Sequence, residues 1–317
     1  MFLGIEIGGT KLQLGVGPAD GQTFAELVRL DVDIARGGAG IREQITNAGR
    51  DLVARHQVQR IGYGFGGPVF GARGVVQTSH QVSGWDQFPL VEWTEQQLGV
   101  PTRLGNDCDV AALAEATYGA GRNAQTVFYV TVGTGIGGGL VIRRQIHGTD
   151  RPAAAEIGHL RPGIEATTAH HTIESIAAGP AISARVQRWL RELTDERLCN
   201  DAAKELLSAV NGRIDALTTK HLSAAANRGN VLAQQSYDKA TTMLGWAIAQ
   251  VITLIAPDVV VVGGGVSLAG ETVFFQPLRE SVDLFSFPPL RHACPVIPAA
   301  LGESVVVHGA LALAAAG

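Results

Sequence analysis

The feature that most constrains this chain is a glycine turn between short apolar runs, which occurs in both halves. Near the start, Glu6-Ile-Gly-Gly-Thr-Lys-Leu separates the runs Phe2–Ile7 and Leu12–Val16. Near the middle, Val132-Gly-Thr-Gly-Ile-Gly-Gly-Gly-Leu ends the run Thr126–Val132 and leads into another. Short apolar runs bounded by glycine are typical of strands. Each half is therefore expected to contain a strand–turn–strand hairpin with a threonine in its turn.

The segments between and after these hairpins alternate between strand and helix signals. Apolar residues at helical spacing predict helices, and short β-branched runs predict strands. The predicted strands are Phe24–Val32, Arg60–Gly66, Thr102–Leu104, Gly139–Ile142 and Val259–Val262. The predicted helices are Ile41–Val53, Leu90–Leu98, Cys108–Tyr118 opened by Asp107, a helix-rich stretch from Thr172 to Ile255, and Ser304–Ala316. This alternation indicates an α/β fold, and the break at Gly119–Arg122 predicts a domain boundary.

Composition excludes several classes of protein. The 25 Lys and Arg residues are balanced by 29 Asp and Glu, and no basic run suggests a nucleic-acid or membrane partner. The three cysteines, Cys108, Cys199 and Cys294, form no pair, which fits a reducing compartment. The first residues lack a basic segment and do not resemble a secretory signal. The apolar stretch Trp246–Ile255 is too short for a membrane span and predicts a buried helix. We therefore expect a cytoplasmic protein.

Two glycine patterns imitate nucleotide-binding motifs that this chain does not have. The spacing G-x-G-x-x-G occurs at 62–67 and at 133–138. The dinucleotide fingerprint requires that a helix follow directly, but proline follows the first match and a strand-like run follows the second. A GxxxxGK[ST] loop is absent from the sequence. Neither match therefore indicates a nicotinamide or flavin enzyme, and the sequence contains no P-loop motif.

The glycine turns are candidates for binding phosphate. Glycine lets backbone N–H groups approach an anion closely, and two hairpins facing across a cleft would grip a polyphosphate from both sides. Glycines that simply supply positive φ at hairpin turns are the alternative. A third run, at 263–265, leaves room for a flat ring such as adenine, or is only a tight turn. The candidate cofactor-binding residues are Gly9, Thr10, Lys11, Gly133, Thr134, Gly135, Gly263, Gly264 and Gly265.

Asn106 and Asp107 stand between a predicted strand and a predicted helix. Either residue is a good helix N-cap, which is one explanation of the pair. The other places the Asp107 carboxylate in a cleft as the base that accepts a hydroxyl proton during phosphoryl transfer. A helix N-terminus stabilises a carboxylate, so we expect Asp107 to stay ionised and to be a weaker base.

Three more polar residues suit a sugar site, because each sugar hydroxyl both donates and accepts hydrogen bonds. Glu156 and His159 are three residues apart and share a face if this turn is helical. Glu174 follows Thr172 closely, and the alternative is an acid in a first helical turn that Thr172 caps.

These motifs together resemble the ROK family (repressor, open reading frame, kinase), which includes bacterial glucokinases. The motifs occur in the family's order and span nearly the whole chain: Glu6-Ile-Gly-Gly-Thr-Lys, Leu104-Gly-Asn-Asp-Cys-Asp-Val-Ala-Ala, Val132-Gly-Thr-Gly-Ile-Gly-Gly-Gly, Glu156-Ile-Gly-His159, Ile173-Glu174-Ser175 and Val262-Gly-Gly-Gly. The resemblance implies a two-domain, actin-like and ribonuclease H-like ATPase fold, with ATP and sugar in an interdomain cleft. We expect a small domain of residues 1–117, a large domain of residues 118–301, and a C-terminal helix, 302–317, that packs back on the first domain.

The resemblance also implies an ATP-dependent hexose kinase that acts on a glucose-like sugar at the 6-hydroxyl, with Asp107 as general base. Gly66-Gly67-Pro68 looks like the family's sugar-side loop with the last two residues transposed. The implied sugar-binding residues are Gly67, Asn106, Asp107, Glu156, His159 and Glu174.

Two departures from the family concern metals. Members usually carry Asp where this chain has Glu6, and the carboxylate helps to hold Mg²⁺; the longer side chain reaches the metal directly or through water. Many members also bind zinc through the histidine that corresponds to His159 and three cysteines. The segment Leu160–Ile173 contains no cysteine, so we expect no zinc. A different metal site formed by His170-His171 with His159 is the alternative to a pair of surface histidines.

Two rival functions stay open at this point. The first is a non-catalytic sugar sensor; regulators of this family carry a helix-turn-helix segment before the first glycine motif, whereas this sequence begins at that motif. The second is a kinase for an N-acetylated amino sugar, which the loop Ser79–Trp85 would decide. We expect a homodimer that binds a sugar and ATP, and neither nucleic acid nor a membrane.

Overall fold

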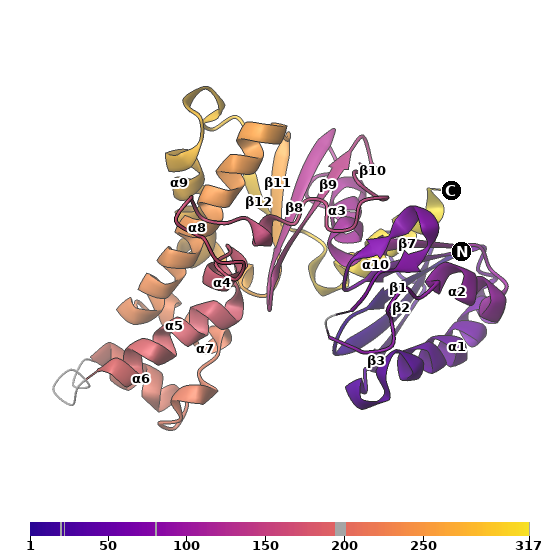
Figure 1. Ribbon diagram of the computed structural model, residues 1–317, viewed down its shortest axis with the longest axis horizontal. Helices are drawn as coiled ribbons and strands as arrows, with labels where there is room; N and C mark the ends of the chain where they lie inside the picture. The colour runs from indigo at the N-terminus through magenta and orange to yellow at the C-terminus, as the bar shows by residue number, and fades with distance from the viewer. Residues whose placement is uncertain (20, 22, 80, 194–200, 317) are drawn as a thin grey trace. The chain divides into compact units, whose positions relative to one another are not determined.

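The computed structural model describes residues 1–19, 21, 23–79, 81–193 and 201–316 of the chain. Contacts between Cα atoms divide the chain into two compact units (Figure 1). Unit 1 comprises Met1–Tyr129, Gly138–Ala155 and Ala299–Gly317. Unit 2 comprises Val130–Gly137 and Glu156–Pro298. The boundary that we placed after residue 117 stays a prediction, and Cys199 lies outside the described residues.

Unit 1 is built on a five-stranded sheet of order β3-β2-β1-β4-β7. The strands β1, β2 and β3 are antiparallel neighbours, and β4 and β7 continue the sheet in parallel with β1. The strands are β1 Phe2–Ile7, β2 Lys11–Gly17, β3 Glu26–Asp31, β4 Arg60–Phe65 and β7 Thr102–Asn106. The helices of this unit are α1 Gly37–His56, α2 Leu90–Leu98, α3 Asp107–Thr117 and α10 Val305–Ala315. A small antiparallel pair, β5 Val69–Phe70 and β6 Val75–Val76, follows β4.

Glycines on one face of this sheet explain how the C-terminal helix packs so closely on it. A Cβ placed on Gly4 would lie 2.6 Å from the Val307 carbonyl oxygen, and one on Gly62 would lie 2.0 Å from the Ala310 carbonyl oxygen. Side chains at these positions would therefore push α10 away from β1 and β4. Because strand residues alternate between faces, Glu6 shares the face of Gly4 and stands on the same side of the sheet as α10.

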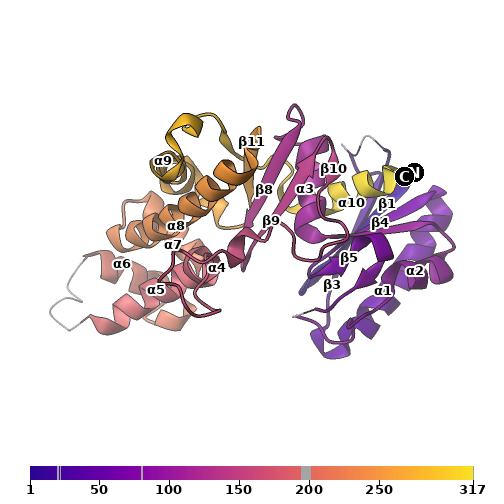
Figure 2. The ribbon, with the colours of Figure 1, turned by 45° about the horizontal axis from the view of Figure 1, so that its top comes forward.

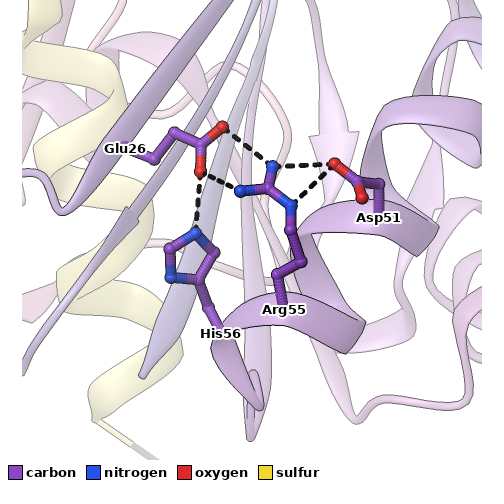
Figure 3. Close-up of polar contacts among 4 residues, drawn as sticks. All are labelled: Glu26, Asp51, Arg55 and His56. Carbon is purple, nitrogen blue, oxygen red and sulfur yellow. Dashed lines mark hydrogen bonds and ion pairs between the residues drawn. The ribbon is translucent and has the colours of Figure 1, made fainter.

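An ion cluster on the surface of unit 1 joins β3 to the end of α1 (Figure 3). The Arg55 guanidinium donates to both carboxylate oxygens of Glu26, at 2.8 and 2.9 Å, and also to Asp51. His56 Nε2 lies 2.7 Å from Glu26 Oε2. Hydrogen bonds from Arg55 and then His56 lower the pKa of Glu26 to about 2. The cluster is exposed to solvent, so we assign it a structural role of small energy.

The second half of the chain contains another five-stranded sheet, of order β10-β9-β8-β11-β12. Its strands are β8 Thr126–Val132, β9 Ile136–Ile142, β10 Gln145–Ile146, β11 Val259–Gly263 and β12 Val296–Pro298. The helices of unit 2 are α4 Glu174–Ala177, α5 Gly179–Glu192, α6 Asp201–Ala209, α7 Thr219–Asn227, α8 Val231–Ile255 and α9 Gln276–Phe285. Figure 2 shows α5 and α7 gathered along α8. None of the described helices has the length and apolar character of a membrane span.

Most predicted elements are confirmed to within a few residues. Leu90–Leu98 and Thr126–Val132 have the predicted bounds. The helix that we predicted from Ile41 begins earlier, at Gly37. The prediction missed this first turn because its glycines carry no apolar signal. The predicted buried helix at 246–255 is the end of α8, but Leu254 is 85% exposed. Burial therefore does not extend to the last turn of this helix.

Candidate active site

Asn106 and Asp107 stand where β7 ends and α3 begins, as predicted. The Asn106 side chain caps the helix, because its Oδ1 accepts hydrogen bonds from the backbone N–H groups of Cys108 and Asp109, at 2.8 and 3.3 Å. Its Nδ2 donates to the Gly67 carbonyl oxygen at 3.0 Å. Asn106 therefore has the structural role that a cap would have, and it also ties the loop after β4 to the start of α3.

The Asp107 carboxyl lies beside this loop. A Cβ placed on Gly66 would lie 3.6 Å from Asp107 Oδ2 and 3.7 Å from Gly8 Cα. Both neighbours present backbone without a side chain, so a ligand can approach the carboxyl closely. The loop glycines and the first glycine turn are thus brought together around Asp107 within unit 1.

Burial sets the protonation of Asp107. Loss of solvent raises the pKa of this carboxyl to about 6, the Cys108 backbone N–H lowers it, and the nearby Glu6 carboxylate raises it. We expected the helix N-terminus to keep Asp107 ionised and to make it a weaker base. The second part was wrong, because the cost of burying the charge exceeds the stabilisation that the helix N-terminus provides; with a pKa of about 6 the carboxyl is still mostly ionised at pH 7. The carboxyl is a stronger base than the sequence suggested.

The Glu6 carboxylate is buried in unit 1, and both of its oxygens have partners. Gln13 Nε2 donates to Glu6 Oε2 at 2.5 Å, and Lys11 Nζ lies 3.5 Å from Glu6 Oε1. Burial raises the pKa of Glu6, whereas Lys11 and then Gln13 lower it. Glu6 and Asp107 interact electrostatically, and carboxylate oxygens are the ligands that Mg²⁺ prefers. This donor set therefore fits a hydrated divalent cation held at Glu6.

The first glycine turn, at residues 8–10, is covered by a side chain that sequence analysis missed. A Cβ placed on Gly9 would lie 1.6 Å from Gln81 Oε1, so the Gln81 amide occupies the space directly over Gly9. Gln81 belongs to the loop 79–85, of which residue 80 lies outside the described part of the chain. Thr10 and Lys11 complete the turn, with the Thr10 carbonyl accepting from Val32 N–H.

The second glycine turn, at residues 133–135, is open by comparison. A Cβ placed on Gly133 would meet no atom within 4 Å. The Glu174 carboxylate is next to this turn, because its Oε2 accepts from the Ile136 N–H at 2.7 Å. The N-cap residue of the short helix α4 is Ile173 and not Thr172, although Thr172 Oγ1 accepts from the Ser175 N–H at 3.3 Å. The Glu174 carboxylate is thus bonded to the start of β9 and has a role beyond a first-turn acid.

Glu156 and His159 stand at either end of a single 3-10 turn, Ile157–His159. The His159 N–H donates to the Glu156 carbonyl at 3.1 Å. Glu156 precedes the turn with a non-helical backbone, φ −70° and ψ 72°, so a common face for the two side chains stays a prediction. The turn packs on β9, since a Cβ on Gly158 would lie 2.0 Å from the Ile136 carbonyl oxygen. The chain therefore brings Glu156, His159 and Glu174 to the start of β9, within unit 2.

A pocket of about 980 Å³ opens beside the second turn and lies within unit 2. Its lining includes Gly133 and Thr134, together with Gly179 and Pro180 at the N-terminus of α5. The Gly179 N–H donates to the Gly133 carbonyl at 2.8 Å, which fixes the helix to the turn. A helix N-terminus and bare backbone N–H groups both attract phosphate.

The rest of the pocket combines apolar and polar walls that the sequence did not indicate. Leu217, Val266 and Leu268 supply apolar surface, and Thr219 and Lys220 at the start of α7 supply polar groups. Thr219 Oγ1 donates to the Gly179 carbonyl at 2.6 Å, which links the two helices. Only helix packing brings α7 to this place, so no local signal was available. A largely apolar pocket with a few polar groups is typical of a small-molecule site.

The three glycines at 263–265 differ in their roles. Gly263 is the buried last residue of β11. Gly264 has φ +90°, and a Cβ there would lie 2.4 Å from the Val132 carbonyl oxygen, so glycine is required. Gly265 lines the pocket, and a Cβ there would meet nothing within 4 Å. Space for a flat ring is therefore found at Gly265, and the tight turn is formed by Gly264.

No group of three or more His, Cys, Asp or Glu side chains placed to hold a metal ion occurs among the described residues. His170 and His171 are exposed. The absence of zinc stays a prediction.

Comparisons with known proteins agree on one family. The ROK family model matches residues 2–316. The glucokinase of Streptomyces coelicolor is 31% identical, over 99% of this chain and 97% of its own length. The crystal structure of a ROK family glucokinase from Streptomyces griseus in complex with glucose and AMPPNP matches with a TM-score of 0.81 and 29% identity, covering 100% of this chain and 99% of that one. The ROK hexokinase of Thermus thermophilus matches with a TM-score of 0.79 and 27% identity, over 99% and 97%.

Proposed function

Because this chain belongs to the ROK family and has its actin-like, ribonuclease H-like α/β fold, we propose that it is an ATP-dependent hexose kinase. The similar proteins from Streptomyces are glucokinases, so a glucose-like hexose phosphorylated at its 6-hydroxyl is the first candidate substrate. The observation that carries the proposal is Asp107, a carboxyl with a pKa of about 6 beside two bare glycine segments.

Asp107 supplies the proton acceptor in this reaction. The hydroxyl oxygen of the sugar attacks the γ-phosphorus of ATP, and the bond between this phosphorus and the β,γ-bridging oxygen breaks. The hydroxyl proton moves to Asp107, and ADP leaves. A base whose pKa lies near the working pH is the most effective acceptor. Asn106 holds Gly67 and the start of α3 in place, so that the carboxyl and the sugar loop keep their relative position.

Nucleotide and metal are assigned to separate groups. The pocket beside Gly133, Thr134 and Gly265 suits the nucleoside and its first phosphates, with the N-terminus of α5 favouring the negative charge. Glu6 would hold Mg²⁺, which would neutralise phosphate charge when bound. Lys11, whose Nζ lies 3.5 Å from Glu6 Oε1, would add a charge-assisted contact to a phosphate oxygen. Zinc has no part in this proposal.

Glu156, His159 and Glu174 are assigned to the sugar hydroxyls, together with Gly67 and Asn106. A site built to pair with hydroxyls rejects an analogue that lacks one, since its own polar groups are then unpaired. A kinase for an N-acetylated amino sugar would share these contacts. No specific observation favours that alternative or a sugar sensor. The cytoplasmic location and the homodimer remain predictions of the same proposal.

The proposal is tested by measuring ADP release across a panel of sugars with purified protein, ATP and Mg²⁺. The panel contains glucose, mannose, fructose, N-acetylglucosamine, N-acetylmannosamine and 6-deoxyglucose. We expect turnover of at least one unmodified hexose, and we expect 6-deoxyglucose to bind without being phosphorylated. Sugar binding by calorimetry without any turnover would instead identify a sensor. Turnover of the N-acetylated sugars alone would identify an amino-sugar kinase.

A further inference from the structure

Three polar residues form a row across the first sheet. In the strand register, Glu6 on β1 is paired with Gln13 on β2, and Gln13 is paired with Arg29 on β3. Directly paired residues of antiparallel strands point to the same face and contact each other. The three side chains therefore form a continuous path from the sheet's edge strand, where Arg29 is exposed, to the buried Glu6 carboxylate.

The hydrogen bonds along this row run in one direction. Arg29 Nε donates to Gln13 Oε1 at 2.9 Å, and Gln13 Nε2 donates to Glu6 Oε2 at 2.5 Å. A guanidinium can only donate hydrogen bonds. Arg29 therefore determines which end of the amide faces it, and the NH₂ group of Gln13 must face Glu6.

Because Gln13 and Glu6 are buried, the loss of the hydrogen bond between them would be costly in free energy. Gln13 is 1% exposed and Glu6 is 8% exposed. Glutamine is seldom buried so fully, and a buried polar group without a partner is costly. The neighbours of Gln13 along the strand, Leu12 and Leu14, are buried apolar residues. An amide at this position is thus explained by the carboxylate that it contacts.

The row leaves the two oxygens of Glu6 with different surroundings. Gln13 holds Oε2, and Oε1 lies 3.5 Å from Lys11 Nζ, at the end of the first glycine turn. A glutamate side chain has one more rotatable bond than an aspartate, so it needs an external restraint to present one oxygen in a defined direction. The amide of Gln13 provides that restraint.

We propose that Gln13 and Arg29 are positioning residues for the Glu6 carboxylate: Arg29 orients the Gln13 amide, and the amide fixes one oxygen of Glu6 so that the other is presented to Mg²⁺ and the phosphates. This inference rests on the proposed function, in which Glu6 holds the cation. Neither residue is among those assigned to the sugar or to proton transfer.

The first test replaces Gln13 with Met, which has a similar length and no polar hydrogen. Its matched control is Gln96→Met, because Gln96 makes the same kind of bond to Glu92, at 3.1 Å, on the exposed surface of α2. The readout is the Kd of AMPPNP measured by calorimetry with and without Mg²⁺. Mg²⁺ should lower the Kd of AMPPNP by a factor that is about 10-fold smaller in Gln13→Met than in the wild type, a size typical for partners of metal ligands. The Kd without Mg²⁺ should be unchanged. Gln96→Met should match the wild type in both conditions.

The second test uses Arg29, which is exposed and whose replacement leaves the core intact. Arg29→Met should lose a smaller part of the gain from Mg²⁺, and Arg29→Lys should restore part of it, because a lysine can still donate to Gln13. The double variant Gln13→Met/Arg29→Met should be no worse than Gln13→Met alone, since Arg29 acts through Gln13. If the two substitutions reduce the gain from Mg²⁺ additively, Arg29 does not act through Gln13, and the proposal is wrong.

The outcomes separate this inference from the proposed function. A wild type that phosphorylates a hexose, together with a Gln13→Met variant that keeps the full gain from Mg²⁺, overturns the inference alone. A wild type with no kinase activity and no effect of Mg²⁺ on nucleotide affinity overturns both. If Gln13→Met fails to fold, the Arg29 variants decide: an unchanged gain from Mg²⁺ in Arg29→Met then rejects the inference.

Discussion

The two glycine turns of this chain look alike in sequence and differ in their surroundings. At the first, residues 8–10, the space over Gly9 is filled by Gln81, and two carboxylates, the buried Glu6 and the half-buried Asp107, are close by. At the second, residues 133–135, the space over Gly133 is empty and opens into a pocket of about 980 Å³. One hairpin pattern thus produces a crowded turn beside two carboxylates in one unit. In the other unit it produces a turn that contacts Glu174 at Gly135 and is open to a mostly apolar pocket at Gly133.

In both turns the glycines permit another group to come close to the backbone, and the neighbouring side chains determine which kind of group can bind there. Buried carboxylates suit proton transfer and cation binding, whereas an apolar pocket beside a helix N-terminus suits a nucleotide. We therefore expect substitutions at the first turn to affect turnover, and substitutions at the second to affect nucleotide affinity.

The largest expected effect comes from Asp107→Asn. Asparagine has nearly the same size and can still accept from the Cys108 N–H, so folding should be preserved. Loss of the proton acceptor should lower kcat by about 10²- to 10⁴-fold, while the Kd for the sugar changes little. Steady-state kinetics, sugar calorimetry and a melting curve check this together. Survival of kcat to within a few-fold of wild type would mean that Asp107 is only part of the helix start.

Glu6 should show the next largest effect. Glu6→Gln removes the charge that would hold Mg²⁺, and we expect kcat/KM to fall by about 10- to 100-fold. Glu6→Asp keeps the charge and should be tolerated if water bridges the carboxylate and the metal. The measurement is a Mg²⁺ titration of both variants. A Glu6→Gln variant that behaves as wild type across the titration would make this residue structural.

The pH dependence should follow the raised pKa of Asp107. A base must be ionised to accept a proton, so kcat/KM should fall about tenfold per pH unit below pH 6, whereas an aspartate with its ordinary pKa of 3.8 would keep activity to much lower pH. The raised pKa of Asp107 has the opposite effect on the stability of the fold, which it favours at low pH. A carboxyl whose folded pKa is raised stabilises the fold below about pH 4, and this contribution is lost as the pH rises through 6. An acid limb near pH 4 in the kcat/KM profile would contradict the assignment.

The smallest effects should separate two adjacent glycines of unit 2. Gly264→Ala introduces a Cβ that would lie 2.4 Å from the Val132 carbonyl at a φ of +90°, and we expect it to destabilise the protein by about 1–3 kcal/mol. Gly265→Ala meets open space, so its melting temperature should equal that of the wild type. Its methyl group enters the pocket and should weaken AMPPNP binding a few-fold. Equal melting temperatures for both variants would show that the turn is not strained in this way.

The sequence predicted the positions of the site residues better than their environments. The bounds of β8 and the start of α3 at Asp107 follow from local patterns of apolar residues and caps. The pKa of Asp107 was predicted in the wrong direction, because burial depends on how the loop at Gly66 packs beside the carboxyl. Gln13 was read only as a strand residue.

The residues that were missed owe their positions to contacts between distant segments. Gln13 meets Glu6 and Arg29 only through the strand register, and Gln81 reaches Gly9 from a separate loop. Thr219 comes to the pocket beside Gly133 through the packing of α7 on α5. No spacing along the chain encodes these contacts, so local patterns carry no signal for them.

The proposed reaction transfers the γ-phosphoryl group of ATP to a hexose hydroxyl. Phosphorus NMR of the purified wild type with ATP, Mg²⁺ and glucose follows both the donor and the product of this transfer, with Asp107→Asn as the matched control. We expect the γ-phosphate signal to decline while a sugar monophosphate ester signal rises in equal amount, and we expect Asp107→Asn to show neither change over the same time. Release of inorganic phosphate alone, or an unchanged ATP spectrum with every hexose of the panel, would contradict the claim.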